Sequence, residues 1–141
     1  MVSIKSVHAK EPLPEYNMPF LPAVTSEGGK IVWLAGCGPI PVYHKHPHVP
    51  AEEREWLSGN FREQFDRTIA NVRMVLEAAG GTLQSVVKMT VYLTDMTMQN
   101  ELNDAIFHYF GRENPPPRPL IGVASLSHAD MLIEIDVNAV V

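Results

Sequence analysis

The stretch Ile133-Glu134-Ile135-Asp136-Val137-Asn138-Ala139 alternates apolar residues with acidic or amide residues at every step. In a β-strand, successive side chains point to opposite faces of the sheet, so this pattern predicts one buried face and one polar face. We expect the strand to span residues 131–141. Glu134 then lies on the face opposite the hydrophobic core.

A second alternating stretch, residues 86–93, predicts another strand of the sheet. One side carries Val87, Met89, Val91 and Leu93, and the other carries Val86, Lys88, Thr90 and Tyr92. The polar faces of both strands therefore also contain apolar or aromatic groups. Because a partly apolar sheet face is costly to leave in water, we expect it to pack against other subunits.

Two further stretches have the periodicity of amphipathic helices. Apolar residues recur at helical spacing from Phe61 to Leu76, and Gly80-Gly81 follows as a stop signal. A second helix is predicted from a cap at Thr97 to Phe110. Both apolar faces would cover the same side of the sheet.

The beginning of the chain predicts short strands. Residues 3–7 are typical of a strand, and the proline-rich residues 12–22 of an extended loop. Residues 23–35 have the pattern of a hairpin, because Gly28-Gly29 supplies the positive φ values of a tight turn.

With a further strand over residues 119–126, the predicted order is β-β-β-α-β-α-β-β. This order is typical of an α+β fold with two helices on one face of a sheet. The length of 141 residues indicates a single domain over residues 1–141, with a substantial core.

Composition excludes several classes of function. Eleven basic and 16 acidic residues give a net charge of −5, which argues against binding to nucleic acid or an acidic membrane. A lone Cys37 forms no internal disulfide or multi-cysteine metal site. No stretch has transmembrane length or the apolar core of a signal peptide, so we expect a cytoplasmic protein.

Arg118 lies within the stretch Pro115-Pro116-Pro117-Arg118-Pro119. Proline rings fix the backbone, so this arginine is held on a rigid segment. Its planar array of five donors matches a carboxylate or a phosphate. With the Glu134 carboxylate on a neighbouring strand as an acid or base, the pair predicts a site for a small anionic ligand.

A set of segments spread over nearly the whole chain occurs in a familiar order and spacing. The segments are Val32-Trp33-Leu34-Ala35-Gly36 with Gly38-Pro39, Gln64 with Asn71, Glu77-Ala78-Ala79-Gly80, Val87-Lys88-Met89-Thr90-Val91-Tyr92-Leu93-Thr94-Asp95, Asn103 with Phe110, Pro117-Arg118, and Ile133-Glu134-Ile135-Asp136-Val137-Asn138-Ala139. Together they resemble the Rid/YjgF family of imine and enamine deaminases. The resemblance implies a chorismate-mutase-like α+β fold and a homotrimer with three clefts between subunits.

The same resemblance implies roles for individual residues. Arg118 corresponds to the arginine that binds the substrate carboxylate, and Glu134 to the glutamate that holds the attacking water. The chain differs from family deaminases at four places. Phe20 stands in the region of a tyrosine, Leu120 at the place of a cysteine, and Cys37 at the place of a glutamine, and the excursion over residues 43–55 is longer than in the compact members. The expected substrate-binding residues are Arg118, Cys37, Gly38, Phe20, Tyr92, Asn103 and Leu120.

Two other features of the sequence are candidates for chemical sites. Cys37 has no partner base in the sequence, so we interpret it as a small buried residue and not as a nucleophile. His44, His46 and His48 alternate before acidic residues, but alternate residues of an extended chain point apart. We therefore expect no metal site and no cofactor, and interpret this stretch as a loop that contacts substrate or another subunit.

Three functions remain at this point. The first is hydrolytic deamination of a carboxylate-bearing imine or enamine with release of ammonia. The second is a non-catalytic sensor that binds a small metabolite in the same cleft. Retention of Glu134 favours the enzyme, whereas the changes at Phe20 and Leu120 favour the sensor. The third, a ribonuclease, has little support in an acidic chain. The sequence does not identify the substrate.

Overall fold

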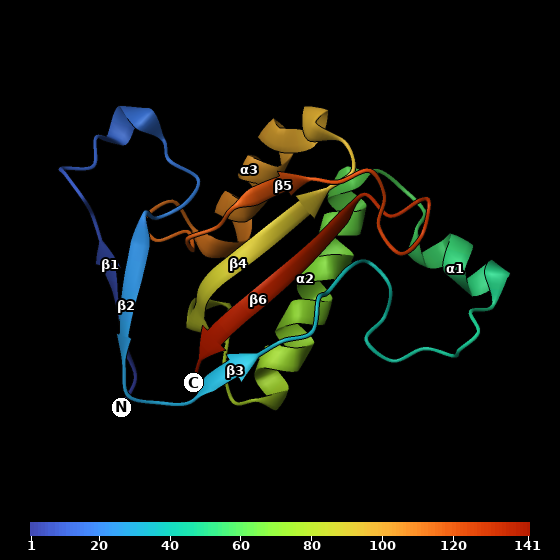
Figure 1. Ribbon diagram of the computed structural model, residues 1–141, viewed down its shortest axis with the longest axis horizontal. Coiled ribbons are helices and arrows are strands. Elements are labelled where there is room, and N and C mark those ends of the chain that lie inside the picture. Colours follow the sequence, from blue (N-terminus) through green and yellow to red (C-terminus); the bar gives the residue numbers. More distant parts are fainter.

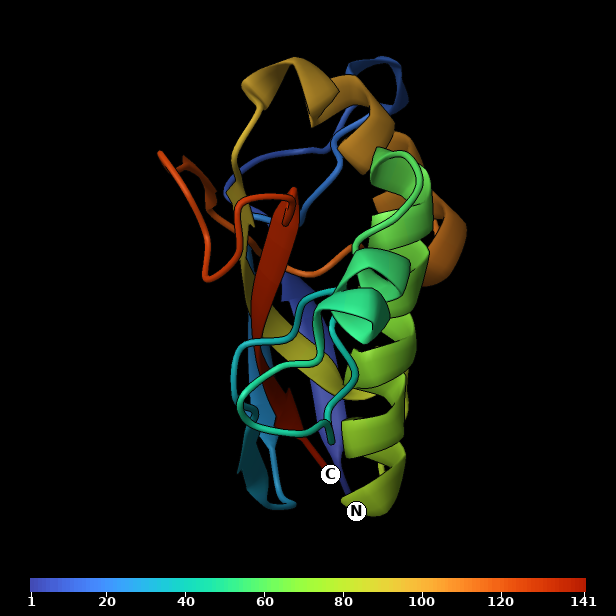
Figure 2. The same ribbon diagram turned by 90° about the vertical axis from the view of Figure 1, so that its right-hand side faces the viewer.

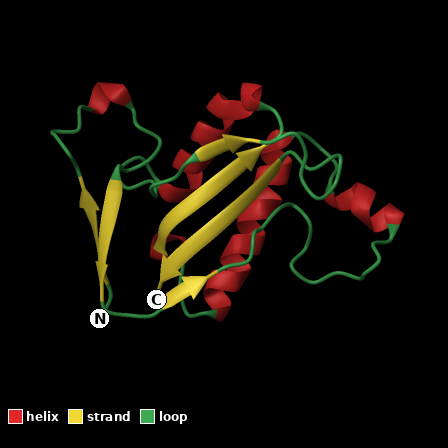
Figure 3. Cartoon of the chain, in the orientation of Figure 1, coloured by secondary structure: helices red, strands yellow, loops and turns green.

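The computed structural model describes residues 1–141 and contains two β-sheets flanked by helices (Figures 1 and 3). A four-stranded sheet has the order β3-β6-β4-β5, and a separate two-stranded sheet pairs β1 with β2. The strands are β1 (Ser3–Val7), β2 (Ala23–Glu27), β3 (Ile31–Trp33), β4 (Val86–Leu93), β5 (Leu120–Gly122) and β6 (Ile133–Val140). The α-helices are α1 (Pro50–Trp56), α2 (Phe61–Ala78) and α3 (Gln99–Phe110).

The antiparallel pair of β4 and β6 forms the centre of the larger sheet. Tyr92 lies opposite Glu134 in this pairing, and β5 runs parallel to β4 on its other side. Ile133, Ile135 and Val137 are fully or almost fully buried, whereas Glu134 is half-buried. The predicted alternation of β6 is therefore confirmed.

Helices α2 and α3 cover one face of this sheet (Figure 2). Asn60 begins α2 with a capping box, because its side chain accepts from the backbone N–H of Glu63 and Glu63 reaches back to Asn60. The predicted apolar stripe is confirmed: the buried residues of α2 include Phe61, Phe65, Ile69, Val72 and Leu76.

The start of the last helix differs from the prediction. A short 3₁₀ turn, Met96–Met98, precedes α3, which begins at Gln99. Asp95 caps this turn, because its carboxylate accepts from both the backbone N–H and the hydroxyl of Thr97. The Thr97 hydroxyl thus donates to Asp95 and does not cap a helix itself.

The predicted hairpin over residues 23–35 is wrong. Gly28 and Gly29 do adopt positive φ values of 73° and 76°, but β2 pairs with β1 and β3 pairs with β6. The two glycines therefore form the turn, but a turn between two strands does not decide which strands pair. Instead, the glycines carry the chain from the small sheet to the large one.

The β1–β2 sheet lies against the segment that follows α3 (Figure 1). Leu21 donates its backbone N–H to the carbonyl of Pro115 at 2.9 Å, and Ser6 donates to the Asn114 side chain at 2.7 Å. These contacts place the loop before β2, including Phe20, beside the proline-rich segment.

Two other boundaries differ from the prediction. β5 ends at Gly122 and not at residue 126, and residues 123–132 form a connection to β6 without regular strand pairing. Residues 43–55 contain part of a helix, α1, that the sequence analysis missed. Pro50 at its first turn is a start signal for a helix, because the missing N–H has no partner there anyway.

The face of the large sheet opposite the helices carries exposed apolar groups. Trp33 is 72% exposed and Ile31 is 58% exposed, and both lie on the edge strand β3. An assembly that covers this face stays a prediction. None of the helices is long and apolar enough to cross a membrane.

Candidate functional site

Arg118 is held on the helix-covered side of the sheet, at its β5 edge. The carbonyls of Pro117 and Pro119 accept from the backbone N–H groups of Met89 and Val91, both at 3.1 Å, so the proline-rich segment extends the pairing of β5 with β4. The side chain reaches toward α3, where Nη2 donates to Oδ1 of Asn103 at 2.6 Å.

The guanidinium group is also packed against an aromatic ring. Its central carbon lies 5.7 Å from the ring centre of Phe20, within the range of a cation–π contact. Phe20, Asn103 and Arg118, three of the predicted site residues, are thus brought together. A cavity of about 400 Å³ is lined by Phe20 and Arg118.

Arg118 lacks a partner for its charge within the chain. It is 9% exposed, its Nε is buried without a hydrogen bond, and none of the ion pairs includes it. Burial lowers the pKa of Arg118 from the usual value of an arginine. A buried cation with an unbonded donor costs free energy unless an anion binds it, so the group is suited to a carboxylate or phosphate.

Glu134 lies on the other side of the sheet, and Gly36 allows its position. A Cβ atom on residue 36 would overlap with Oε1 of Glu134, so the carboxylate can keep this position because residue 36 is glycine. The next residue, Cys37, exchanges two backbone hydrogen bonds of 2.8 Å with Ile135. These bonds fix residues 36–38 alongside β6.

Cys37 is buried and protonated at neutral pH. Burial raises the pKa of its thiol, and the carboxylates of Glu134 and Asp136 raise this pKa further. The sulfur atom lies 3.6 Å from the carbonyl oxygen of Ala35. A thiol with a raised pKa is a poor nucleophile, which agrees with the interpretation of Cys37 as a small buried group.

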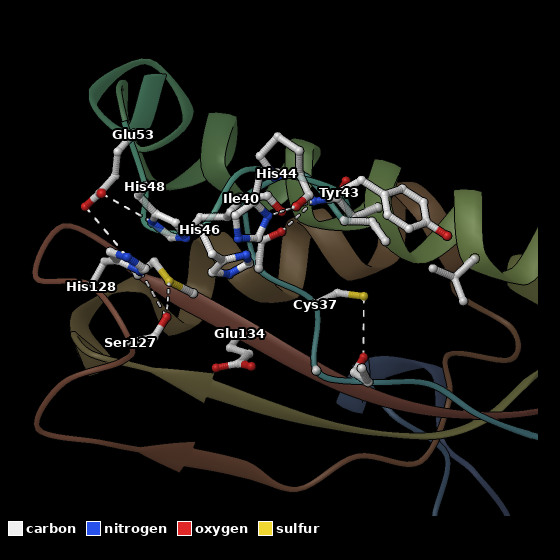
Figure 4. Close-up of a pocket in the computed structure, with 18 residues that line it drawn as sticks. Cys37, Ile40, Tyr43, His44, His46, His48, Glu53, Ser127, His128 and Glu134 are labelled. Carbon is white, nitrogen blue, oxygen red and sulfur yellow. Dashed lines mark hydrogen bonds and ion pairs between the residues drawn. The ribbon is translucent and has the colours of Figure 1, made fainter. Parts of the chain in front are cut away.

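A cavity of about 810 Å³ opens beside Glu134 (Figure 4). Residues 36–38 and Glu134 form one part of its wall. Asn71 and Val75 of α2 and Glu53 of α1 also line it. The loop before α1 and the loop before β6 contribute four histidines: His44, His46, His48 and His128.

The two predicted catalytic residues are not brought together within one chain. Arg118 reaches α3, which covers one face of the sheet, whereas Glu134 alternates with core residues and points to the opposite face. They line different cavities. Of the remaining predicted residues, Cys37 and Gly38 lie beside Glu134, Tyr92 lies opposite Glu134 on β4, and Leu120 pairs with Val91 at the β5 edge.

Polar side chains of α2 position the loops around the larger cavity. Asn71 donates to the carbonyls of Gly38 and Ile40, both at 2.8 Å. Gln64 donates to the carbonyls of Leu57 and Asp130 and accepts from the N–H of Leu132. Arg67 donates to the carbonyls of Trp56 and Ser58.

Sequence reasoning gave these residues no positioning role. The available signal was the placement of Gln64 and Asn71 at helical spacing on the apolar side of α2, where a polar residue needs a buried partner. Gln64 is 1% exposed and Asn71 is 8% exposed.

The histidines of residues 44–48 form a cluster. The ring centre of His44 lies 4.5 Å from that of His46 and 4.6 Å from that of His48, and the ring centres of His46 and His48 lie 5.3 Å apart. The expectation that these alternate residues point apart is wrong, because the segment is not an extended strand. His128, from the loop before β6, stacks on His48 at 4.5 Å.

Comparison with known proteins identifies the family. Residues 14–141 match the model of the family described as Endoribonuclease L-PSP. A RutC family protein of Pyrococcus abyssi is 34% identical over 135 residues, which cover 96% of both chains. A RutC family protein of Synechocystis is 37% identical over 140 residues, covering 99% of this chain and 96% of that protein.

The chain belongs to the Rid/YjgF family.

Solved structures of the Rid/YjgF family have the same fold. The Rid family protein YyfB of Yersinia pestis matches with a TM-score of 0.76 and 23% identity, covering 98% of both chains. RidA of a Psychrobacter species matches with a TM-score of 0.65 and 23% identity, covering 97% of this chain and 94% of that one. At this level of identity the likeness shows the fold, and it confirms the predicted α+β class.

Proposed function

We propose that this Rid/YjgF protein is a hydrolytic deaminase of an imine or enamine that bears a carboxylate. Family membership supports this reaction class. The observation that carries the proposal is the buried Arg118 guanidinium, whose Nε has no hydrogen-bond partner and whose charge has no counter-ion. The substrate carboxylate supplies both.

The chemistry follows from placing such a substrate between Arg118 and Glu134. Arg118 binds the carboxylate, so the C=N carbon lies beside a water held by Glu134. The water oxygen bonds to this carbon as Glu134 accepts a proton. Glu134 returns its proton to the nitrogen as the carbinolamine forms. The carbinolamine then loses its hydroxyl proton through Glu134 to the departing nitrogen, forming a C=O bond as its C–N bond breaks. The products are ammonia and a carbonyl compound, formed from one imine and one water.

We further propose that the working site lies between subunits of a homotrimer. Within one chain the two residues lie on opposite faces of the sheet and line different cavities, so neither cavity offers both groups to one substrate. The exposed Trp33 and Ile31 lie on the uncovered face and favour its burial by another subunit. In the trimer, each active site combines Arg118 of one subunit with Glu134 of the neighbouring subunit.

The test of catalysis is ammonia release from a 2-imino acid that an amino-acid oxidase generates in the assay. The wild-type protein should accelerate release above the buffer rate. Glu134→Gln should reduce turnover by roughly 10²–10⁴-fold, because the amide cannot accept a proton from water. Binding of a stable carboxylate analogue should change little in this variant. Equal ammonia release by the variant and the wild type would remove Glu134 from the mechanism.

Mixing two inactive variants tests the composite cleft. Light scattering should first give a trimer for each protein. After subunit exchange, a trimer that contains both Arg118→Ala and Glu134→Gln chains regenerates a cleft with an intact Arg118 and an intact Glu134. Activity should therefore reappear on mixing. No recovery after verified exchange would place both residues of a site in the same chain.

A metabolite sensor is the second candidate, and Phe20 is the observation that favours it. The residue packs on Arg118 through its ring but offers no hydroxyl group to a substrate. Tight binding of carboxylate ligands together with no acceleration of any imine would select the sensor. The net charge of −5 gives no physical support to RNA cleavage, although the matching family model is named for an endoribonuclease.

A further inference from the structure

We propose that His44, His46 and His48 bind one divalent transition-metal ion of the Zn²⁺ type, in the wall of the larger cavity. Each of the three imidazoles offers one nitrogen, and these nitrogens lie within 4.8 Å of one another. Tetrahedral coordination with Zn–N bonds of about 2.0–2.1 Å requires nitrogens about 3.4 Å apart. Small side-chain rotations close this difference in a loop where His46 is exposed.

In two of these residues, a hydrogen bond determines which ring nitrogen keeps its lone pair and is available to bind an ion. Nδ1 of His44 lies 2.7 Å from the carbonyl oxygen of Pro41. Because a carbonyl oxygen only accepts, Nδ1 carries the proton and Nε2 keeps its lone pair. Nδ1 of His48 lies 3.3 Å from Oε2 of Glu53, with the same consequence. Metal-binding histidines usually have such a carbonyl or carboxylate partner on the second nitrogen.

The charges around the cluster favour a cation. Glu53 and Glu134 both line the cavity, and no lysine or arginine does. An imidazole cluster beside two carboxylates therefore presents lone pairs and negative charge to the same space (Figure 4). Imidazole nitrogens are typical ligands of zinc, copper, nickel and iron, so the chemistry points to this class and not to Mg²⁺ or Ca²⁺.

The cluster is supported from behind by a helix. The ring of Trp56, at the end of α1, makes edge-on contacts with two of the histidines. Its ring centre lies 5.6 Å from that of His44 and 5.8 Å from that of His48. Arg67 of α2 holds this end of α1 by donating to the carbonyl of Trp56 at 2.8 Å. Three histidines on a supported loop leave a fourth coordination position free, as in sites that bind water or another small ligand.

His128 and Glu53 offer an overlapping set with His48. We assign Glu53 to orienting His48, because its Oε2 is already directed to Nδ1 of that ring. His128 stacks face to face on His48, and its Nε2 lies 3.7 Å from Oε1 of Glu53. Replacing His128 therefore separates the two possible ligand sets.

The experiment measures metal binding to the full-length protein without a histidine tag, after removal of metals by a chelator. Titration with Zn²⁺ in a calorimeter should give one ion per chain. Co²⁺ should produce the visible absorption bands of four-coordinate cobalt. Both readouts are independent of ammonia release. The metal-site proposal can therefore be supported when the deaminase proposal is contradicted, and the deaminase proposal can be supported when the metal-site proposal is contradicted.

Variants then assign the ligands. Glu53→Gln removes only the hydrogen-bond partner of a ligand and should weaken Zn²⁺ binding by roughly 10–100-fold. His44→Asn, His46→Asn and His48→Asn each remove a ligand and should weaken Zn²⁺ binding by more than this. His128→Asn and the exposed control His8→Asn should bind as the wild type does. Circular dichroism should show that each variant is folded.

Two results would overturn the proposal. One is the absence of stoichiometric Zn²⁺ or Co²⁺ binding by the wild-type protein. The other is loss of binding in His128→Asn with full binding in His46→Asn, which would assign the ion to the other set.

Discussion

Nη2 of Arg118 donates to Oδ1 of Asn103 at 2.6 Å, while Nε of the same guanidinium is buried without a partner. The direction of the Arg118 side chain is thus fixed by α3, while its guanidinium group keeps a buried donor without a hydrogen bond. A donor that is oriented and desolvated before a ligand arrives loses little further freedom on binding. The same arrangement lowers the stability of the empty protein, which leads to the first prediction.

Replacing Arg118 with methionine should separate stability from binding. Methionine fills similar space without a buried charge, so the free energy of unfolding should stay the same or rise by about 1–3 kcal/mol, the cost of an unsatisfied buried group. Carboxylate binding should be lost. Denaturant unfolding and calorimetric titration measure the two effects. Arg118→Lys keeps the positive charge but loses the paired N–H donors of the guanidinium group, so the affinity for carboxylates should fall. A less stable Arg118→Met protein would show that the guanidinium supports the fold.

Gly36→Ala should displace the Glu134 carboxylate. The added Cβ overlaps with Oε1 of Glu134, and the side chain must move away from residue 36. We expect turnover to fall while binding through Arg118 is kept, because Arg118 lies on the other side of the sheet. Gly122→Ala is the matched control, since its Cβ meets only the flexible Met96 side chain. Equal turnover in both variants would mean that the Glu134 position is not critical.

Gln64→Leu should destabilise the protein by about 3 kcal/mol, because the carbonyls of Leu57 and Asp130 and the N–H of Leu132 lose a buried partner. The change should also increase hydrogen exchange in the loop before β6. Gln99→Leu serves as the control, because Gln99 is exposed and makes no side-chain hydrogen bond. A loss of stability no larger than in this control would contradict the anchoring role.

Asp66 should contribute stability that depends on pH. Partial burial raises the pKa of Asp66, but hydrogen bonds from the Tyr109 hydroxyl and from Arg62 outweigh this effect and leave the pKa below its usual value. The stabilisation is therefore present above the unfolded pKa of about 3.9 and is lost as pH falls through the lower folded pKa. Solvent screening limits its size, since the side chain is 44% exposed.

Unfolding of the wild type and of Asp66→Asn, measured from pH 7 to pH 2, checks this expectation. The difference in stability between the two proteins should be constant at neutral pH and should shrink below about pH 4. A difference that grows on acidification would have the wrong sign for a lowered pKa.

Much of the fold could be predicted from periodicity. The alternation of β4 and β6 and the apolar stripe of α2 each depend on residues close in sequence, and all three elements are confirmed. Strand partnership could not be predicted in the same way. Gly28 and Gly29 have the φ values of a hairpin turn, but β3 pairs with β6, more than a hundred residues away in the chain.

The sequence singles out candidate site residues but does not give their arrangement in space. Arg118 and Glu134 stood out through a rigid segment and an alternating strand, whereas their placement on opposite faces depends on the pairing of β5 and β6 with β4. The histidine cluster could not be predicted, because contact between His48 and His128 joins two loops distant in sequence. Local reasoning treated residues 44–48 as extended, and the bent loop brings their rings together.

The three anchoring residues of α2 all bind main-chain carbonyl oxygens, which every amino acid possesses. Gln64, Arg67 and Asn71 therefore hold the loops around the larger cavity mainly through the loop backbone, and the Ser58 hydroxyl, 3.4 Å from Nη2 of Arg67, is their one side-chain partner there. Natural variation or deliberate redesign can exchange loop residues such as Tyr43 or His46 without loosening this attachment. The architecture separates the parts that preserve the scaffold from the parts free to acquire a new ligand preference.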